Sequence, residues 1–334
     1  MANPNDRGFN TIQNSRVTRR RKNETLQLYT LLGVIGMAVL TIVIVAVMGV
    51  GSLVGDDTPG PAGEKVEWGS FTVTATDTLH GDLVIVNNSH AYTFPTTNEH
   101  LAEIYTKCAS HSPMMYLQSG ISTYMDKDAL NALDAMLVDF ATATSRTNVQ
   151  IRDAYRTYEQ QENKEILPGH SDHHTGLGCA LKYLPENGPP AHDLSLDTTY
   201  TWLYDNAHKY GFVIRYPEAK ADVTGVSDYE EYFRFVGIPH ATYMKEQNLC
   251  MEEYVNLLKE YDNKNPLKIN AADGKYYEVY YVAVDGSATV KYPTNYAYSV
   301  SGTNEGGVVI TVDRSATINE ADTSADTASG TENP

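Results

Sequence analysis

The sequence predicts an α+β fold: a compact mixed domain with a small antiparallel sheet flanked by helices, preceded by one transmembrane helix and followed by a small β-rich appendage. Three observations indicate this arrangement. Residues 25–55 hold a long uncharged span, helical and strand patterns alternate from residue 81 to 261, and the chain becomes dense in Tyr and Val after Pro266. The alternation shows no internal repeat and has the length of an ordinary domain.

The N-terminal part predicts a membrane anchor. Residues 1–24 form a basic stub of net charge +4, whereas the rest of the chain carries −21, for −17 overall. Leu28–Val50 is almost wholly apolar, and at about 1.5 Å per residue it spans a hydrocarbon core of roughly 30 Å. No A-x-A cleavage site follows it. Because the basic cluster precedes the span, we expect a single-pass signal anchor over 25–55, a cytoplasmic N-terminus and an extracytoplasmic main domain in the cell membrane.

A linker and the main domain follow the anchor. The linker is expected over residues 56–80, because Asp56–Lys65 is rich in Pro and Gly. The main domain is expected over residues 81–265. Its apolar patterns predict helices at Asp128–Thr144, Leu196–Tyr210 and Met251–Tyr261, and strands at Val149–Asp153 and Gly211–Arg215.

The C-terminal part predicts a small β-rich appendage over residues 266–313. Lys275–Val284 and Gly307–Val312 have strand composition. The tyrosine run Tyr276–Tyr281 invites a carbohydrate-stacking interpretation, but its composition favours an ordinary strand whose Tyr side chains pack on the domain. Residues 314–334 lack aromatic residues and predict a disordered acidic tail.

Composition narrows the class of function. The hydrophobic fraction of 42% excludes wholesale disorder. The strong acidity argues against a nucleic-acid partner, since phosphate binding needs clustered Lys and Arg. Cys108, Cys179 and Cys250 are too few for a disulfide scaffold and are most simply isolated thiols, with a Cys108–Cys250 bridge left open.

Three segments carry residues suited to chemistry. They are Ala154–Gln161 (AYRTYEQQ), Pro168–Leu181 (PGHSDHHTGLGCAL) and Thr224–Gly237 (TGVSDYEEYFRFVG). Arg156 can clamp a carboxylate through two hydrogen bonds, although a surface ion pair fits this segment equally well. His170, His173 and His174 suggest zinc, but zinc needs three or four converging ligands, and a solvated histidine-rich loop is the plainer interpretation.

Taken together and in order, these segments resemble the VanY-like D-alanyl-D-alanine carboxypeptidases, zinc peptidases that trim peptidoglycan stem peptides. The resemblance covers roughly residues 81–261 and includes GDLVIVNNSH and WLYDNAHKYGFVIRYP. The family has Y-R-[ST]-x-x-x-Q, which holds substrate, then S-x-H-x-x-G-x-A-x-D, and finally E-x-W-H-[FY]-R-[YF]-V-G. The resemblance implies substrate-binding roles for Arg156, Gln161 and Ser171, and a zinc-ligand role for His173.

The sequence departs from the family pattern at the metal centre. The expected Asp ligand falls on Ala180, the expected His ligand on Tyr232 and the expected catalytic base on Tyr229. Cys179 is no substitute, because strand alternation points it away from the face of Ala180. His173 alone remains of the three ligands, so we expect no tightly bound zinc. The sequence therefore predicts a pseudoenzyme that binds a peptidoglycan stem peptide, or another peptide terminus, without cutting it.

Two alternatives remain open. One is an active metallo-carboxypeptidase with an unusual metal site, built from His170 or His174 with Asp172 or Asp193. The other is a cell-surface scaffold in which the β-rich segment Lys275–Val312 docks a partner and the cleft is vestigial.

Overall fold

The structure, a computed structural model, describes residues 66–120, 123–227 and 229–317. The expected basic stub, the anchor over 25–55 and the tail beyond residue 317 lie outside the described residues. Within the described ranges, no helix is long and apolar enough to cross a membrane. The described residues belong to one compact unit.

A six-stranded sheet lies at the centre of the main domain, with strand order β3-β5-β6-β9-β8 and with β7 paired to β6. Its strands are β3 (Leu117–Gln118), β5 (Val149–Asp153), β6 (Gly178–Tyr183), β7 (His192–Asp193), β8 (Phe212–Ile214) and β9 (Tyr232–Phe235). The expected antiparallel sheet is confirmed for these strands except at one edge, where β3 pairs parallel with β5. The chain between them returns through a helix, and such a crossover brings strands together in parallel. A separate pair joins β2 (Leu101–Glu103) to β4 (Tyr124–Asp126).

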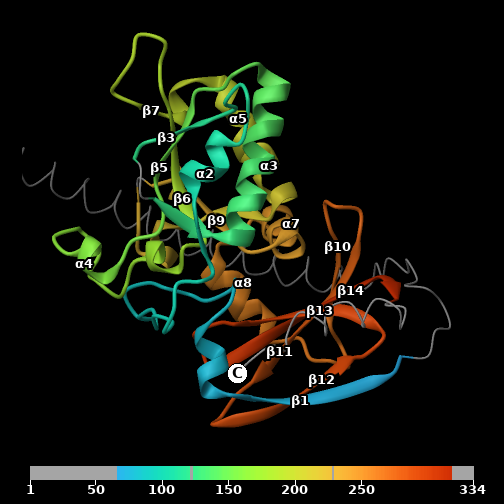
Figure 1. Cartoon of the computed structure of the whole chain (residues 1–334). Coiled ribbons are helices and arrows are strands. Elements are labelled where there is room, and N and C mark those ends of the chain that lie inside the picture. The colour runs from blue at the N-terminus through green and yellow to red at the C-terminus, as the bar shows by residue number, and fades with distance from the viewer. Residues whose placement is uncertain (1–65, 121–122, 228, 318–334) are drawn as a thin grey trace, which may run out of the picture. The chain divides into compact units, whose positions relative to one another are not determined.

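The longest helix among the described residues, α3 (Lys127–Thr144), packs against this sheet (Figure 1). Asp126 caps it by accepting hydrogen bonds from the backbone N–H groups of Asp128 and Ala129. Its expected apolar face is buried, which confirms the helix predicted from spacing at three and four residues. The other helices are α2 (Ile104–Ala109), α4 (Tyr158–Gln161), α5 (Thr201–Asn206), α6 (Ala221–Thr224), α7 (Ile238–Gln247) and α8 (Met251–Leu258).

Several connections are short 3-10 helices rather than loops. The single helix expected over Leu196–Tyr210 is divided, with α5 between two 3-10 segments. The 3-10 helices are η1 (Ala75–Leu79), η2 (Asp172–Thr175), η3 (Leu194–Leu196), η4 (Thr198–Tyr200), η5 (Ala207–Tyr210) and η6 (Glu218–Lys220).

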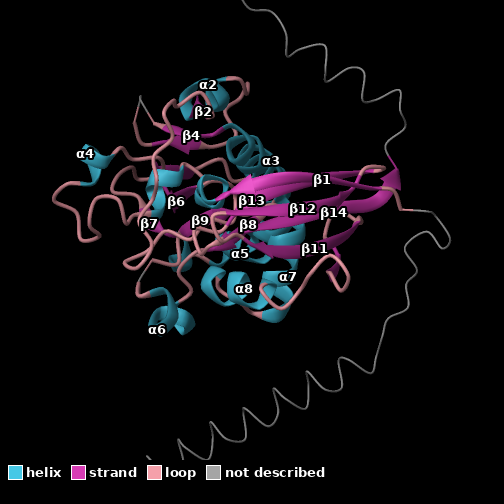
Figure 2. Cartoon of the chain, turned by 90° about the horizontal axis from the view of Figure 1, so that it is seen from below, coloured by secondary structure: helices cyan, strands magenta, loops and turns pink. Residues whose placement is uncertain are grey.

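The C-terminal strands form a β unit, in which a four-stranded sheet lies against a two-stranded pair (Figures 1 and 2). The sheet has the order β10-β11-β14-β13 and the pair is β1-β12. Its strands are β1 (Trp68–Thr74), β10 (Leu267–Asn270), β11 (Tyr276–Ala283), β12 (Ser287–Pro293), β13 (Tyr296–Gly302) and β14 (Gly307–Thr317).

Three boundaries expected from sequence need correction. The linker over 56–80 is wrong from Trp68 onward, because β1 pairs antiparallel with β12 and buries Val73 in the core of the β unit. The tail expected over residues 314–334 is wrong at its start, because β14 continues to Thr317. The boundary at 265/266 does not separate two cores, since Val279 and Val309 of the β unit share one apolar cluster with helices α7 and α8. Deleting the β unit would therefore expose the main domain's own core.

Two smaller expectations are settled here. Tyr280 is buried, and Tyr277 and Tyr281 pack against the shared cluster, which confirms a packed strand in place of a stacking surface. All three cysteines are free and buried, so the Cys108–Cys250 bridge is not formed.

Candidate functional site

The structure brings together the three positions that the family uses for metal. His173 lies on η2, Ala180 on β6 and Tyr232 on β9. Ala180 and Tyr232 are direct cross-strand partners. The imidazole of His173 meets the ring of Tyr232 edge to face, with ring centroids 4.6 Å apart. Cys179 lies in the main core on the opposite face, as strand alternation predicted.

The imidazole of His173 is buried and fully engaged. Its Nδ1 lies 2.7 Å from the backbone oxygen of Ala154, and its Nε2 lies 3.0 Å from the hydroxyl of Tyr229. A carbonyl oxygen only accepts, so Nδ1 carries the proton and Tyr229 donates to Nε2. Burial, aided by the charge of Arg156, lowers the pKa of His173 to about 4 and keeps the ring neutral. The nitrogen that would bind a metal is thus occupied by a phenol.

Three tyrosines fill the rest of this centre. Tyr229 stacks on Tyr232 with centroids 5.3 Å apart and on Tyr216 at 5.8 Å. Burial raises the pKa of Tyr229 and of Tyr232, so both remain protonated phenols rather than anionic ligands. We call His173, Tyr216, Tyr229 and Tyr232 the aromatic centre.

A small residue on β6 makes room for the aromatic centre. A Cβ atom at Gly178 would lie 2.6 Å from the hydroxyl of Tyr232 and 2.7 Å from its ring, closer than such contacts occur. The family pattern has Ala at this position and His in place of Tyr232. The larger residue on β9 and the smaller one on β6 therefore compensate each other, which indicates that the centre is remodelled as one packed unit.

The residues present do not fit a zinc ion. A catalytic zinc site needs three protein ligands drawn from His, Cys, Asp and Glu, with one open position. Here one neutral imidazole faces a methyl group and two protonated phenols. Across the described residues, no group of three or more such side chains is placed to hold a metal. No reaction step through zinc follows from this centre.

The histidines proposed for an unusual metal site are committed elsewhere. His174 is buried, its Nδ1 donates to the backbone oxygen of Arg156 at 2.7 Å, and its Nε2 accepts from the N–H of Gly169 at 3.0 Å. The Nδ1 of His170 lies 2.8 Å from the backbone oxygen of Asn87. The solvated histidine-rich loop is also wrong for His173 and His174, because backbone hydrogen bonds tie both rings into the interior.

The two acids proposed for that site are paired as well. Asp193 lies 2.5 Å from the Nζ of Lys182. Asp172 is 1% exposed and lies between two fully buried guanidinium groups, 3.0 Å from Arg234 and 3.4 Å from Arg215. Arg215 also binds both carboxylate oxygens of Glu252 on α8, at 2.7 and 2.9 Å.

This buried network holds η2 in place through ion pairs and hydrogen bonds. Arg234 on β9 donates to the backbone oxygens of Asp82 and Val84, and Arg215 donates to that of Val86. It therefore ties the apolar segment that begins at Gly81 to β9, α8 and the residue next to His173. Buried charges are tolerated when, as here, they are paired and hydrogen-bonded.

The expected substrate-binding residues lie beside the aromatic centre. Arg156 follows β5, its side chain is 16% exposed, and its Nη1 donates to the side-chain oxygen of Gln161 at 2.8 Å. Gln161 is buried and donates in turn to the backbone oxygen of Ile166. The hydroxyl of Ser171 is buried and has no hydrogen-bond partner within the described residues. We call Arg156 with Gln161 the clamp.

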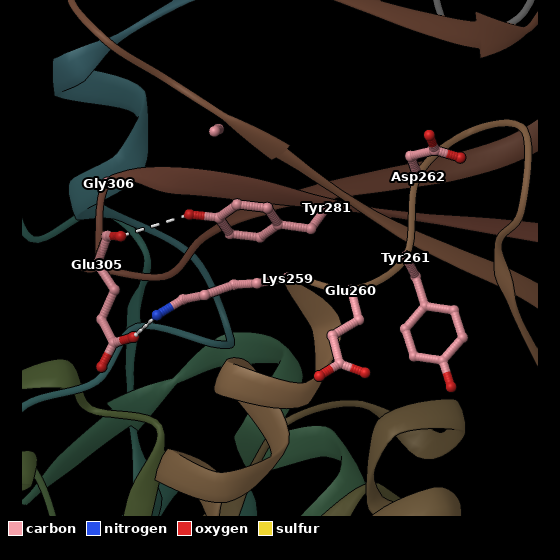
Figure 3. A pocket seen from close by; sticks show the side chains of 8 residues that line it. Lys259, Glu260, Tyr261, Asp262, Tyr281, Glu305 and Gly306 are labelled. Atoms are coloured by element: carbon pink, nitrogen blue, oxygen red, sulfur yellow. Dashed lines mark hydrogen bonds and ion pairs between the residues drawn. The ribbon is translucent and has the colours of Figure 1, made fainter. Parts of the chain in front are cut away.

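A cavity of about 680 Å³ lies away from all of these residues, between the end of α8 and the β unit (Figure 3). Its ammonium group, on Lys259, is already bound to Glu305 at 2.6 Å. The phenol of Tyr281 points to the backbone oxygen of Glu305. None of the residues of the three motifs lines this cavity.

Comparison with known proteins shows which family the chain belongs to. The family model VanY, D-alanyl-D-alanine carboxypeptidase, matches residues 122–238. A D-alanyl-D-alanine carboxypeptidase of Enterococcus faecium is 31% identical over 257 residues, which span 72% of this chain and 78% of the relative. The chain belongs to the VanY family. A second relative, a D-alanyl-D-alanine carboxypeptidase of Enterococcus faecalis, is 39% identical over 100 residues, 30% of this chain and 35% of that protein.

A solved structure shows the same fold. The vancomycin-resistance D,D-dipeptidase VanXYg, crystallised with a D-Ala-D-Ala phosphinate analogue, superposes with a TM-score of 0.63 and 24% identity. The match covers 74% of this chain and 99% of that one. This chain therefore shares the mixed α+β fold of that structure.

Tyr216 and three further residues of the site were missed in the sequence. Gly178 stands where the family motif has Ala, and this difference was visible but was not linked to Tyr232. Asp153 and Arg215 lie just outside the motifs, and nothing in their local pattern shows that the first pairs with Arg156 and the second with Glu252.

Proposed function

We propose that this protein is a membrane-anchored, extracytoplasmic member of the VanY family that binds the carboxyl terminus of peptidoglycan stem peptides and does not cleave them. One observation carries the proposal. The metal-ligand positions are filled by Ala180 and Tyr232, and Tyr229 occupies the free nitrogen of His173, while the clamp beside them retains its guanidinium.

The absence of cleavage follows from the chemistry of the aromatic centre. Hydrolysis of a peptide bond in this family needs a water activated by a metal and a carboxylate that takes its proton. Tyr229 stands in the position of that carboxylate, and burial holds the pKa of its phenol above the ordinary value. A neutral phenol donates a hydrogen bond but does not act as a general base near neutral pH.

Peptide binding is supported by the clamp. A guanidinium held in a fixed orientation recognises a carboxylate through two parallel hydrogen bonds. The side-chain oxygen of Gln161 accepts a hydrogen bond from Arg156 and orients it, and Gln161 itself donates to the backbone oxygen of Ile166. Relatives named D-alanyl-D-alanine carboxypeptidases make a D-Ala-D-Ala terminus the first ligand to test.

Membrane anchoring is supported by the uncharged span over 25–55 and the basic stub before it. We expect the described unit to lie outside the cell. Protease added to intact cells should remove it while leaving an N-terminal epitope tag protected. Protection of the whole chain would contradict this topology.

The decisive experiment measures binding, metal and product on one preparation. Full-length protein in detergent is titrated with a peptide ending in D-Ala-D-Ala and with the same peptide amidated at its C-terminus. We expect saturable binding of the free acid, loss of binding on amidation, substoichiometric zinc and no release of D-Ala. Stoichiometric zinc with chelator-sensitive release of D-Ala would instead show an active enzyme.

A matched pair of variants ties binding to the clamp. Arg156→Gln removes the guanidinium, whereas Arg152→Gln removes an exposed one on the same strand, β5. We expect the first to weaken binding of the free-acid peptide by at least about tenfold and the second to leave it unchanged. Equal effects would mean that general charge, not the clamp, attracts the peptide.

A further inference from the structure

We propose that Asp153 is an internal ligand of the clamp: its carboxylate occupies Arg156 and must be displaced before a peptide carboxylate can bind. This inference rests on the proposed function, because it assigns a regulator to the same site. It makes Asp153 the residue that sets the affinity and the selectivity of the clamp.

The contacts between the two side chains are those of a bound carboxylate. The Nε of Arg156 donates to one oxygen of Asp153 at 3.0 Å, and its Nη2 contacts the other oxygen. The remaining nitrogen, Nη1, donates to Gln161. All three nitrogens of the guanidinium are therefore engaged, and the two that face a carboxylate in parallel already hold one.

The backbone places Asp153 where it can do this. It is the last residue of β5, at an irregularity in the register that sets it opposite Ala180 on β6. The family carries its carboxylate ligand at position 180. This chain has only a methyl group there and a carboxylate on the neighbouring strand instead, turned onto Arg156 while His173 is held by Tyr229. A carboxylate therefore remains at this level of the sheet, on Asp153, but it binds Arg156 of the clamp.

The pair can open without unfolding the domain. The side chain of Asp153 is 35% exposed and that of Arg156 16%, so water reaches the contact. Partly exposed ion pairs contribute little net free energy, because solvation of the separated charges offsets their attraction. Rotation of Asp153 into solvent would leave Arg156 still oriented by Gln161 and ready for an incoming carboxylate.

Occupation of the clamp has a consequence for selectivity. When the binding-competent state of a protein is only partly populated, the apparent affinity for its ligand is reduced by that fraction. A small carboxylate such as acetate offers Arg156 nothing that Asp153 does not already provide, so it should not bind. A peptide terminus that makes further contacts can displace Asp153. The clamp thereby rejects free carboxylates and accepts peptide ends.

The test compares Asp153→Asn with a matched control, Asp193→Asn, which removes a carboxylate bound to Lys182 on β6. Full-length proteins in detergent are titrated calorimetrically with acetate and with a D-Ala-D-Ala-ended peptide. We expect Asp153→Asn to bind the peptide about tenfold more tightly than the wild type and to gain measurable acetate binding, and Asp193→Asn to do neither. Asp153→Ser serves if the first variant does not fold.

The outcomes separate the two proposals. Equal peptide affinity in the wild type and in folded Asp153→Asn overturns the internal ligand and leaves the proposed function standing. Acetate binding gained by Asp153→Asn, with no peptide binding in either protein, supports the internal ligand and overturns the proposed function. If neither protein binds acetate or peptide, both proposals are wrong.

Discussion

The aromatic centre and the clamp lie side by side in one site, yet they depart from the family pattern to different degrees. In the centre, polar ligands are replaced by a methyl group and buried phenols that pack against His173. In the clamp, the guanidinium is kept, but it is held by a carboxylate of the same chain. The comparison teaches that one part of a site can be remodelled while its neighbour is kept, because the ion pairs of Asp172 with Arg215 and Arg234 link η2, β9 and the end of β8.

The largest effect is expected from a variant that restores the family's metal ligands and base in the aromatic centre. The triple variant Ala180→Asp, Tyr229→Glu and Tyr232→His returns two ligands to strands that already place them opposite each other, and returns the base to the loop before β9. We expect one zinc ion per chain by elemental analysis and release of D-Ala from a D-Ala-D-Ala-ended peptide, whereas the wild type shows neither. Adding His173→Ala should abolish both gains. A folded triple variant without zinc would mean that the three positions do not converge as the sheet register indicates.

The next largest effect is expected from breaking the buried network around Asp172, which holds the site together. Arg234→Met leaves Asp172 buried with a single partner at 3.4 Å and removes donors from the backbone oxygens of Asp82, Val84 and Phe235. We expect a loss of about 3–5 kcal/mol in the free energy of unfolding, measured by urea denaturation. The control, Lys182→Met, breaks a partly exposed pair with Asp193 and should cost less than about 1 kcal/mol. Similar costs would show that burial of the network is unimportant.

Local pattern was sufficient for the elements that organise themselves. The helix at Lys127–Thr144 has its own apolar face and an Asp cap, and β5 coincides with the strand expected at Val149–Asp153. Strand β1 was missed because its partner lies far along the chain: Thr72 pairs with Thr289. It alternates only weakly, and neighbouring Pro and Gly residues resemble a linker.

The site divides in the same way. The family pattern placed His173, Ala180 and Tyr232 together, and the structure brings them together. The family pattern could not show that Asp153 binds Arg156, because a bidentate contact depends on two rotamers and on an irregular register at the end of β5. Nor could the family pattern show that Arg215 reaches Glu252, since that pair joins the residue after β8 to a helix 37 residues later.

Acid should weaken the buried core while leaving the exposed side of the clamp in place. His240 lies between Tyr254 and Thr311, and burial lowers its pKa from 6.5 to about 3. The unfolded chain binds this proton below pH 6.5 and the native state does not, so stability is present above pH 6.5 and falls as the pH falls towards 3. Between pH 6 and 4 this residue should contribute a slope of up to about 1.4 kcal/mol per pH unit.

The measurement compares the wild type with His240→Gln, which preserves hydrogen-bonding groups but does not titrate. Urea unfolding at several pH values between 6 and 4 should show a shallower slope in the variant. The carboxylates act equally in both proteins and cancel in the difference. Identical slopes would contradict a neutral buried imidazole.

The smallest effect is expected from Gly178→Ala, which tests whether the aromatic centre is one packed unit. The backbone of Gly178 does not require glycine, because its φ is not in the left-handed region. Gly178→Ala would therefore be tolerated, or slightly stabilising, were it not for the hydroxyl and ring of Tyr232 within 2.7 Å of the new methyl group. We expect a loss of about 1–2 kcal/mol in the wild-type background from overpacking, and little or none when Tyr232 is His. A double-mutant cycle by urea unfolding measures this coupling directly. If the two substitutions proved additive, Gly178 and Tyr232 would be independent changes, and the centre would be a site that lost its ligands without being repacked.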